Sequence, residues 1–326
     1  MRFAEHWSWC TVETIRDVTP QIREFRLRPD SGGVPPCPAG SHIGVHVLID
    51  GQPARRSYSL VETNDPSTYR IAVRLAPDSR GGSRGMWSLQ PGARIEICNP
   101  TSLLDIDWTR QNYCLIAGGI GITPIMAIAA ALRRRNIDPT LHYAVKSRGD
   151  AAFLDELTAM LGDRLIVHAS DEGARIDLDA TFCALPDDAI VVICGPMRML
   201  EAARRAWNDA GRAPADLRYE TFGSSGLMPT AEFRVRLKGS DTELVVSQSS
   251  SMLDALNAAG YEVISDCQRG ECGVCAVDVV AVDGAIDHRD VFFSDQQKQD
   301  NRKICPCVSR AIGVITIDTL YRPEAA

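Results

Sequence analysis

The chain has 326 residues, 45% of them hydrophobic and 24% charged, which is enough for two or three globular domains. A formal net charge of −7 disfavours nucleic-acid binding, and no stretch approaches the roughly 20 apolar residues that a membrane span requires. The N-terminus lacks the apolar core of a secretory signal, so we expect a cytoplasmic protein without membrane attachment. Its eleven cysteines should then be thiols or ligands.

The first hundred residues predict a small antiparallel β-barrel. Runs at 45–49, 70–75 and 94–97 are β-branched or alternate polar with apolar residues, which is typical of strands. Glycine and proline pairs between them predict turns.

Two pieces of this region together suit a phosphate and an aromatic ring. Arg55-Arg56-Ser57-Tyr58-Ser59-Leu60 offers a cation, a flat ring and a hydroxyl at a strand end. Ser79-Arg80-Gly81-Gly82-Ser83-Arg84 opens a short helix to about Leu89, and a helix start presents free N–H groups to an anion. Each piece alone is equally compatible with an ordinary barrel strand and an ordinary turn.

From about Tyr113 the pattern changes to strands alternating with helices, which predicts a parallel sheet. A buried strand at 113–117 leads into Gly118-Gly119-Ile120-Gly121-Ile122-Thr123-Pro124, with Thr123 suited to the N-cap of the next helix and Pro124 to its first position. Further strands are expected at 141–145, 165–168 and 190–194, and helices at about 151–161 and 197–210.

The turns at the carboxyl ends of these strands predict a nucleotide site. The glycines after 113–117 do not form the full dinucleotide fingerprint, but Cys194-Gly195-Pro196 follows another strand at the edge where such sheets bind nucleotides. Lys146-Ser147-Arg148 follows the strand at 141–145, where an adenine ribose would lie. The alternative is that each glycine only serves a tight strand-to-helix turn.

Residues 211–230 resemble a linker, and a small acidic region follows. Strands are expected at 232–237, 276–282 and 313–317, with a helix that starts at the N-cap Ser251 and ends at Gly260. Residues 231–326 carry fifteen acidic and ten basic residues, a charge of −5 that suits a basic protein partner or simply keeps the domain soluble.

This region contains Cys267, Cys272 and Cys275 in the spacing C-x4-C-x2-C, which is typical of plant-type [2Fe–2S] ferredoxins. A structural zinc site is the alternative, but zinc sites usually pair two short cysteine units or use histidine. Two cysteines downstream, Cys305 and Cys307, could each supply the fourth thiolate. Asp266 and Glu271 flank the loop and are either simply exposed or influence the cluster and its acceptor.

Taken in order, R-x-Y-S, G-G-S, G-G-I-G-I-T-P, C-G-P and C-x4-C-x2-C span nearly the whole chain. This arrangement resembles the phthalate dioxygenase reductase family, which includes the reductase subunit of vanillate O-demethylase. The resemblance implies an antiparallel flavin-binding β-barrel at 1–107, a parallel-sheet NAD-binding domain at 108–226 and a β-grasp-like ferredoxin domain at 231–326.

The resemblance also implies roles for individual residues. The flavin would contact Arg56, Ser57, Tyr58, Ser59, Ala72, Val73, Gly81, Gly82, Ser83 and Phe222. The dinucleotide would contact Gly118, Gly119, Gly121, Thr123, Pro124, Ser147, Arg148, Cys194, Gly195 and Pro196. The cluster ligands would be Cys267, Cys272, Cys275 and, from the family's Cys-Val-Ser-Arg run, Cys307. The segment Asp287-His288-Arg289-Asp290 also matches the family, whereas Pro100–Leu104 departs from it.

The implied activity is that of an oxygenase reductase component that uses FMN, with FAD the less favoured flavin, and NADH, with NADPH as the alternative. Electrons would leave through the cluster to a terminal Rieske oxygenase, and no acid–base side chain is needed as a catalyst. Two other hypotheses stay open: reduction of a different one-electron acceptor such as a cytochrome, and a metal- and nucleotide-binding sensor.

Overall fold

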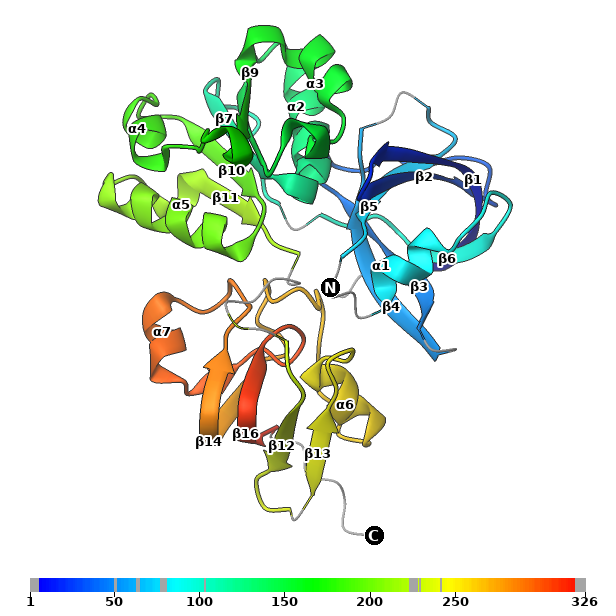
Figure 1. The fold of residues 1–326 in the computed structure, drawn as a ribbon, viewed down its shortest axis with the longest axis vertical. Coiled ribbons are helices and arrows are strands. Elements are labelled where there is room, and N and C mark those ends of the chain that lie inside the picture. Colours follow the sequence, from blue (N-terminus) through cyan, green and yellow to red (C-terminus); the bar gives the residue numbers. More distant parts are fainter. Residues whose placement is uncertain are drawn as a thin grey trace. The chain divides into compact units, whose positions relative to one another are not determined.

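The computed structural model describes residues 6–49, 52–62, 65–76, 81–102, 104–222, 228, 230–240 and 242–319. The chain divides into two compact units, Met1–Glu220 and Thr221–Ala326 (Figure 1). The predicted pieces Ser79-Arg80 and Gly223–Gly226 and the residue Leu103 lie outside the described residues. Within the described ranges, no helix is long and apolar enough to cross a membrane.

The first unit begins with a six-stranded antiparallel sheet in the order β4-β3-β6-β1-β2-β5. A bridge between Leu60 and Ile71 joins its two edge strands, so the sheet closes into the predicted barrel. Inward-facing residues such as Phe25, Leu27 and Ile43 are completely buried. The strands are β1 (Trp7–Thr19), β2 (Ile22–Pro29), β3 (His42–Ile49), β4 (Gln52–Ser59), β5 (Tyr69–Arg74) and β6 (Arg94–Cys98), and the helix α1 (Gly82–Trp87) packs against β3 and β5.

The second part of this unit is a five-stranded parallel sheet in the order β11-β10-β7-β8-β9. The first strand, β7, lies between β8 and β10, so successive connections run in opposite directions from it. Ligands bind at such a switch point, beside the carboxyl ends of the strands. The strands are β7 (Tyr113–Gly118), β8 (Thr140–Val145), β9 (Leu165–Ala169), β10 (Ile190–Cys194) and β11 (Leu217–Glu220).

The helices of this part follow the strands, as predicted. They are α2 (Ile122–Arg133), α3 (Leu154–Leu161), α4 (Leu178–Cys183) and α5 (Met197–Asp209), with single 3₁₀ turns η1 (Gly119–Gly121), η2 (Arg148–Asp150), η3 (Gly162–Arg164), η4 (Ser170–Glu172) and η5 (Pro214–Asp216). Figure 1 shows the helices lying against the sheet in green.

The predicted start of α2 was wrong. Gly121 is the N-cap, and Thr123 lies inside the first turn, where its hydroxyl donates to the Ile120 carbonyl at 3.0 Å. The 3₁₀ turn η1 runs directly into the helix, so the helix begins before the residue that a cap rule selects. Likewise α3 begins at Leu154, because Phe153 adopts a left-handed conformation with φ of 61°.

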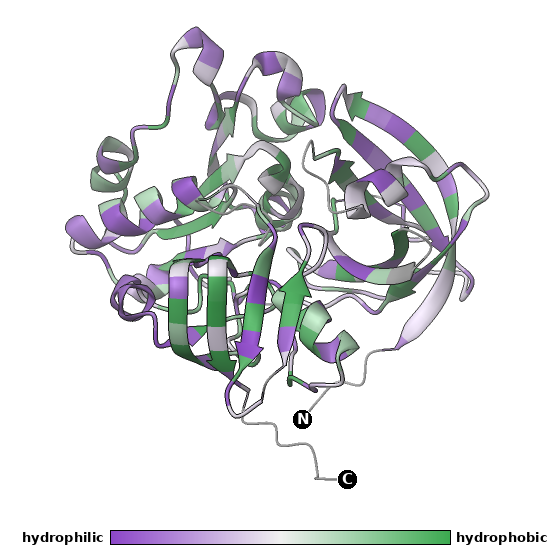
Figure 2. Cartoon of the chain, turned by 60° about the horizontal axis from the view of Figure 1, so that its bottom comes forward, coloured by the Kyte–Doolittle hydropathy of each residue, from purple (hydrophilic) through white to green (hydrophobic). Residues whose placement is uncertain are grey.

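The second unit is a mixed sheet in the order β13-β12-β16-β14-β15, in which only β12 and β16 are parallel. Along β12, Phe233, Val235 and Leu237 are buried while the arginines between them are exposed, and Figure 2 shows such alternation on these strands. The elements are β12 (Phe233–Leu237), β13 (Glu243–Val246), α6 (Met252–Ala258), β14 (Val277–Asp287), α7 (Asp295–Asp300), β15 (Lys303–Ile304) and β16 (Arg310–Asp318). The β-grasp-like prediction is confirmed.

Helix α6 has the predicted ends. The Ser251 hydroxyl accepts a hydrogen bond from the Asp254 N–H at 3.0 Å, and the Asp254 carboxylate accepts one from the Ser251 N–H. Gly260 follows the helix with φ of 84°. This helix and the sheet place the cysteine loop, which lies between α6 and β14.

Candidate flavin, nucleotide and iron–sulfur sites

The barrel brings together the residues predicted to bind a flavin. Arg56 on β4 lies across the start of α1, where a Cβ added at Gly82 would come within 2.6 Å of the Arg56 Nε. Gly81 caps α1 with φ of 87°, and the Ser83 hydroxyl accepts from the Ala76 N–H at 3.3 Å. An arginine and a helix start thus meet at one place on the barrel, as an anion site requires.

The end of β4 supplies a second observation. Ser59 is 4% exposed, and among the described residues its hydroxyl has no hydrogen-bond partner. A buried hydroxyl without a partner is costly, so a ligand that bonds to it fits this position. Ser59 lies next to the Leu60–Ile71 bridge, which places β4 beside Ala72 and Val73 of β5. Burial raises the pKa of Tyr58, so its phenol is neutral.

The predicted nucleotide glycines lie at the switch point of the parallel sheet. A Cβ at Gly118 would lie 2.7 Å from the Pro196 ring, and one at Gly121 would overlap the Cys194 carbonyl. Gly195 in turn lies against the backbone of Gly118. The loop after β7 and the loop after β10 therefore touch backbone to backbone, which only glycine permits.

Ser147 and Arg148 lie at the end of β8, the neighbouring strand. Ser147 caps the turn η2, and its hydroxyl donates to Asp150 at 2.9 Å. The Arg148 Nε donates to Glu172 in the turn after β9, at 3.0 and 3.1 Å to the two carboxylate oxygens. The Arg148 guanidinium, predicted to lie at the ribose, thus has an acidic partner that the sequence did not predict.

The cysteine loop depends on two glycines with positive φ. A Cβ at Gly270 would lie 2.5 Å from Val308 and 2.8 Å from the Cα of Asp290, and one at Gly273 would overlap the Phe292 ring. The Arg269 N–H points at the Cys267 sulfur at 3.4 Å. Close wrapping of backbone around sulfur is what an anionic sulfur cluster requires.

Three sulfurs meet on one side of this loop. The Sγ atoms of Cys275 and Cys307 are 3.3 Å apart, and the hydrogen bonds that Cys305 and Cys307 donate lower the pKa of Cys275 to about 3. The contact with Cys275 raises the pKa of both Cys305 and Cys307. The pKa of Cys307 is also raised by the charge of Cys267 and lowered by the Gly270 N–H, and both of these residues belong to the loop. The pKa of Cys305 is raised instead by the charge of Asp290. Among the described residues, no group of three or more His, Cys, Asp or Glu side chains is arranged to hold a single metal ion.

The segment Asp287-His288-Arg289-Asp290 supports this loop, a role that the sequence analysis did not assign. Asp290 is completely buried, and its carboxylate accepts from the Phe293 N–H at 3.0 Å and from the Ser309 hydroxyl at 3.1 Å. Its backbone packs against Gly270. The segment therefore connects the first cysteines with the Cys307-Val308-Ser309 turn.

Glu271 is not the exposed charge considered above. Its side chain is 11% exposed, pairs with Arg269 at 3.1 Å and accepts from the Thr221 N–H at 2.9 Å. Burial raises the pKa of Glu271, although Arg269 opposes this. Phe222 is described as part of the second unit, so its predicted place near the flavin stays a prediction.

Comparison with known proteins agrees with this geometry. Residues 235–311 match the family described as 2Fe-2S iron-sulfur cluster binding domain. The phenoxybenzoate dioxygenase subunit beta of Ectopseudomonas oleovorans is 39% identical over 292 residues, 87% of this chain and 88% of that protein. The heme-dependent oxidative N-demethylase beta subunit of Ectopseudomonas mendocina is 36% identical over 304 residues, 93% and 95% of the two chains.

Two further likenesses identify the family. The vanillate O-demethylase oxidoreductase of Acinetobacter baylyi is 32% identical over 312 residues, 94% of this chain and 96% of that protein. The structure of phthalate dioxygenase reductase superposes with a TM-score of 0.77 at 28% identity, over 96% of this chain and 98% of that one. The chain belongs to the phthalate dioxygenase reductase family. It is an oxidoreductase with a flavin- and nicotinamide-type reductase fold and a [2Fe–2S] domain.

Membership in this reductase family supports a cluster rather than zinc at the C-x4-C-x2-C loop. The likeness to phthalate dioxygenase reductase extends over all three sheets, since the match covers 96% of this chain.

The backbone contact at the switch point leads to a prediction. Gly121→Ala should lower the free energy of unfolding of the first unit by about 2–3 kcal/mol, because its Cβ overlaps the Cys194 carbonyl and β10 must move. Gly119→Ala is the matched control: its site has open space and φ of 53°, so only the backbone cost of about 1 kcal/mol applies. Denaturant unfolding followed by flavin fluorescence measures both, and equal losses would contradict the contact.

Proposed function

We propose that the chain is the reductase component of a Rieske-type oxygenase system. In this proposal a bound FMN would accept a hydride from NADH, and single electrons would leave through the [2Fe–2S] domain to a terminal oxygenase. The observation that carries this is the presence of a flavin-type barrel, a glycine-lined switch point and a cluster domain in one chain. A nicotinamide supplies two electrons together, a flavin accepts them, and a [2Fe–2S] cluster passes them on one at a time.

In this proposal the chain's task is to hold and orient the flavin. Arg56 with the N–H groups of Gly81, Gly82 and Ser83 binds its phosphate, and Ser59 donates its otherwise unpaired hydroxyl. The remaining contacts are Ser57, Tyr58, Ala72, Val73 and Phe222. The described structure supports this through the approach of Arg56 to Gly82 and the buried Ser59 hydroxyl.

The nicotinamide dinucleotide is assigned to the switch point. Gly118, Gly119, Gly121, Thr123 and Pro124 surround its phosphates, Cys194-Gly195-Pro196 lies beside the nicotinamide, and Ser147 and Arg148 meet the ribose. Support comes from the edge position of all three segments in the parallel sheet. Arg148 is paired with Glu172, and this favours NADH, because the carboxylate opposes a 2′-phosphate at that place.

The cluster ligands are proposed to be Cys267, Cys272, Cys275 and Cys307. Cys307 is preferred because it contacts Cys275 and also interacts with the loop residues Cys267 and Gly270. Cys305 is completely buried beside Leu253 and Phe293 in the same cluster as Cys275 and Cys307, so the interactions with Cys267 and Gly270 are what favour Cys307. Thiolate ligands and a reducing compartment are consistent with a cytoplasmic location.

The acceptor is proposed to be a separate oxygenase, as the names of the relatives indicate for those proteins. A haem protein is the second candidate, because one relative is the beta subunit of a heme-dependent oxidative N-demethylase. The −5 charge of residues 231–326 suits a basic docking surface on either acceptor. The extents proposed are 1–107, 108–226 and 231–326 for the flavin, nucleotide and cluster domains.

Purified full-length protein provides the test of this function. It should contain one flavin and two irons per chain. Addition of NADH without oxygen should decrease the visible absorption of both the flavin and the cluster. Extraction and chromatography of the flavin should yield FMN. Protein without flavin, or with a flavin that neither NADH nor NADPH reduces, would contradict the proposal and favour a sensor.

The fourth ligand can be tested with two neighbouring cysteines. Cys307→Ser should lower the iron content by more than half and weaken the charge-transfer absorption, since a thiolate ligand is lost. Cys305→Ser should keep wild-type iron. Cys272→Ser serves as the positive control for ligand loss, and the reverse order of the two test variants would assign the ligand to Cys305.

The pairing of Arg148 with Glu172 predicts nicotinamide preference. Glu172→Gln should lower the KM for NADPH by about 2–5-fold, the range expected for one exposed charge, and leave the KM for NADH unchanged. Arg148→Gln should raise the KM for NADPH and is the control. Steady-state kinetics with both nucleotides measures this, and an equal shift for both would refute the role of Glu172.

A further inference from the structure

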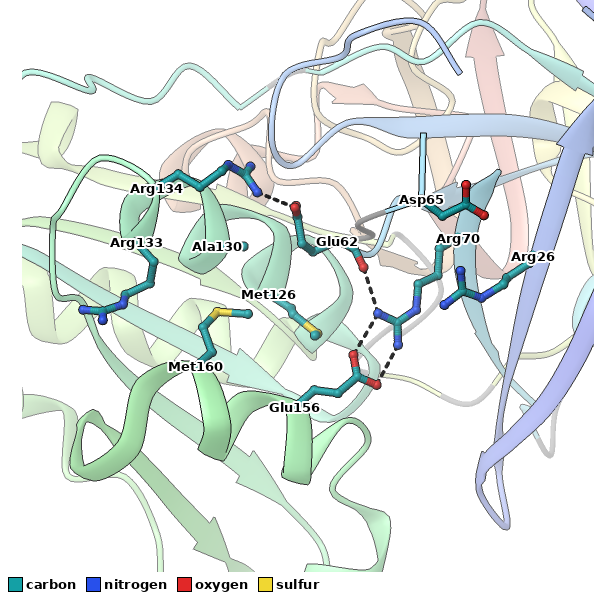
Figure 3. A pocket seen from close by; sticks show the side chains of 10 residues that line it. All are labelled: Arg26, Glu62, Asp65, Arg70, Met126, Ala130, Arg133, Arg134, Glu156 and Met160. Carbon is teal, nitrogen blue, oxygen red and sulfur yellow. Dashed lines mark hydrogen bonds and ion pairs between the residues drawn. The ribbon is translucent and has the colours of Figure 1, made fainter. Parts of the chain in front are cut away.

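The barrel and the parallel sheet of the first unit are joined by a cluster of charges centred on the buried Arg70. Arg70 on β5 donates to Glu24 on β2, with Nε–Oε2 at 2.9 Å, and to both oxygens of Glu156 on α3 at 2.8 and 2.9 Å. Figure 3 shows the Arg70 guanidinium between Glu62 and Glu156. The side chains of Arg70 and Glu24 are 5% exposed, so neither charge is solvated by bulk water.

Arg70 lies close to the residues assigned to the flavin. Residues 70 and 72 of a strand share a face, so Arg70 and Ala72 both point away from the barrel core that contains Ile71 and Val73. Strand β5 also packs against the turn η1, which contains Gly119 and Gly121. The strand that carries Arg70 therefore touches the proposed nucleotide loop directly.

On the other side, the start of α3 is held under strain. Phe153 has φ of 61°, which is unusual for an aromatic residue, and its ring lies 4.8 Å from the Arg70 guanidinium carbon. Glu156 lies in the first turn of α3, where a helix favours an acid. Burial opposes its ionisation, but hydrogen bonds from Arg70 and Arg16 lower the pKa of Glu156, so it is charged.

A second contact leads from α3 to the nucleotide loop. The buried Tyr143 hydroxyl accepts from the Ala152 N–H at 3.1 Å and donates to the Gly119 carbonyl at 3.2 Å. Ala152 directly precedes Phe153. The charge cluster on the barrel is thus connected through the start of α3 and Tyr143 to the glycine loop after β7.

The seam beside this cluster is not filled by apolar packing. A groove of about 720 Å³ lies along it, between Arg26 and Arg70 of the barrel and Met126 and Met160 of α2 and α3 (Figure 3). Other polar contacts across the seam are more exposed, such as that of Arg134 with Glu62. Of the ion pairs described across this seam, Arg70–Glu156 is the most shielded from water, with side chains 5% and 38% exposed.

We infer that Arg70, Glu156 and Tyr143 are positioning residues that fix the nucleotide loop against the flavin strands and so set the rate of hydride transfer. The inference rests on the proposed function. Reacting atoms must approach to about 3–3.5 Å for such a transfer, so a small shift between the two binding surfaces is costly.

The experiment uses the full-length holoprotein and two variants. Glu156→Gln keeps an acceptor for Arg70 but removes the charge, and Tyr143→Phe removes only the hydroxyl. Substitution of Arg70 is avoided because Glu24 would lose its one buried cationic partner among the described residues and keep only the more exposed Arg16 and Arg26. Each variant should lower the rate constant of anaerobic flavin reduction in stopped-flow mixing by about 10-fold or more, while flavin content and the Kd for NADH stay within about 2-fold.

Hydrogen exchange supplies a readout independent of the reaction. The amides of residues 152–156 and 119–122 should exchange faster in both variants than in the wild type. Arg134→Gln, which removes an exposed pair across the same seam, is the matched control and should change neither exchange nor the rate constant by more than about 2-fold.

The outcomes separate the two proposals. A wild-type flavin that no nicotinamide reduces would overturn the proposed function. A normal wild-type rate together with unchanged rates in both variants would overturn only the positioning role, as would a loss in the Arg134→Gln control equal to theirs. Slower reduction explained entirely by a weaker Kd for NADH would also overturn it.

Discussion

A guanidinium removed from water needs carboxylates around it, and Arg70 finds them on two different parts of the chain. Glu24 belongs to the barrel and Glu156 to the α/β part, so the charge is satisfied only when both are in place. Removing one partner of a pair buried on both sides, such as Arg70 with Glu24, costs about 3–5 kcal/mol, whereas an exposed pair such as Arg148 with Glu172 is worth about 1 kcal/mol or less. The contact with Glu156, whose side chain is 38% exposed, links this buried arginine to the α/β part and helps to hold the two sheets of residues 1–220 in one compact unit.

Glycines allow segments of backbone to contact one another closely in two loop regions. Gly118, Gly121 and Gly195 let the turns after β7 and β10 touch through their backbones, and Gly270 lets the cysteine loop lie on Asp290. A side chain at any of these positions would separate segments that the sheets otherwise bring together. The same residue type therefore serves a nucleotide edge in one unit and a sulfur loop in the other, for one steric reason.

The sequence was most informative where function demands local spacing. The C-x4-C-x2-C loop, the glycines after 113–117 and the Ser251 cap are each contained within ten residues, so their patterns are visible without a fold. Arg70 and Glu156 are 86 residues apart, and nothing in either neighbourhood indicates their contact. Glu172 was missed for the same reason, because a charge pair between elements leaves no periodic pattern.

The error at Thr123 shows a different limit. Threonine followed by proline is a sound start signal, yet the turn η1 was already helical, and tertiary contact at Gly121 fixed the true cap. The cap therefore followed from the approach of β10, which is a non-local property.

The division of the chain agrees with the chemistry proposed for it. A hydride must pass between atoms in near contact, so the surfaces proposed to bind its donor and acceptor belong in one compact unit, and apart from Phe222 the proposed residues lie within 1–220. Single electrons pass without the close alignment of reacting atoms that a hydride needs, so the cluster can occupy a unit of its own, residues 221–326. On this argument the buried charges are placed where rigidity matters most, at the seam between the barrel and the nucleotide sheet. In the second unit, buried polar contacts also lie beside the cysteine loop, where the Ser309 hydroxyl accepts from the Arg289 N–H and donates to the Asp290 carboxylate.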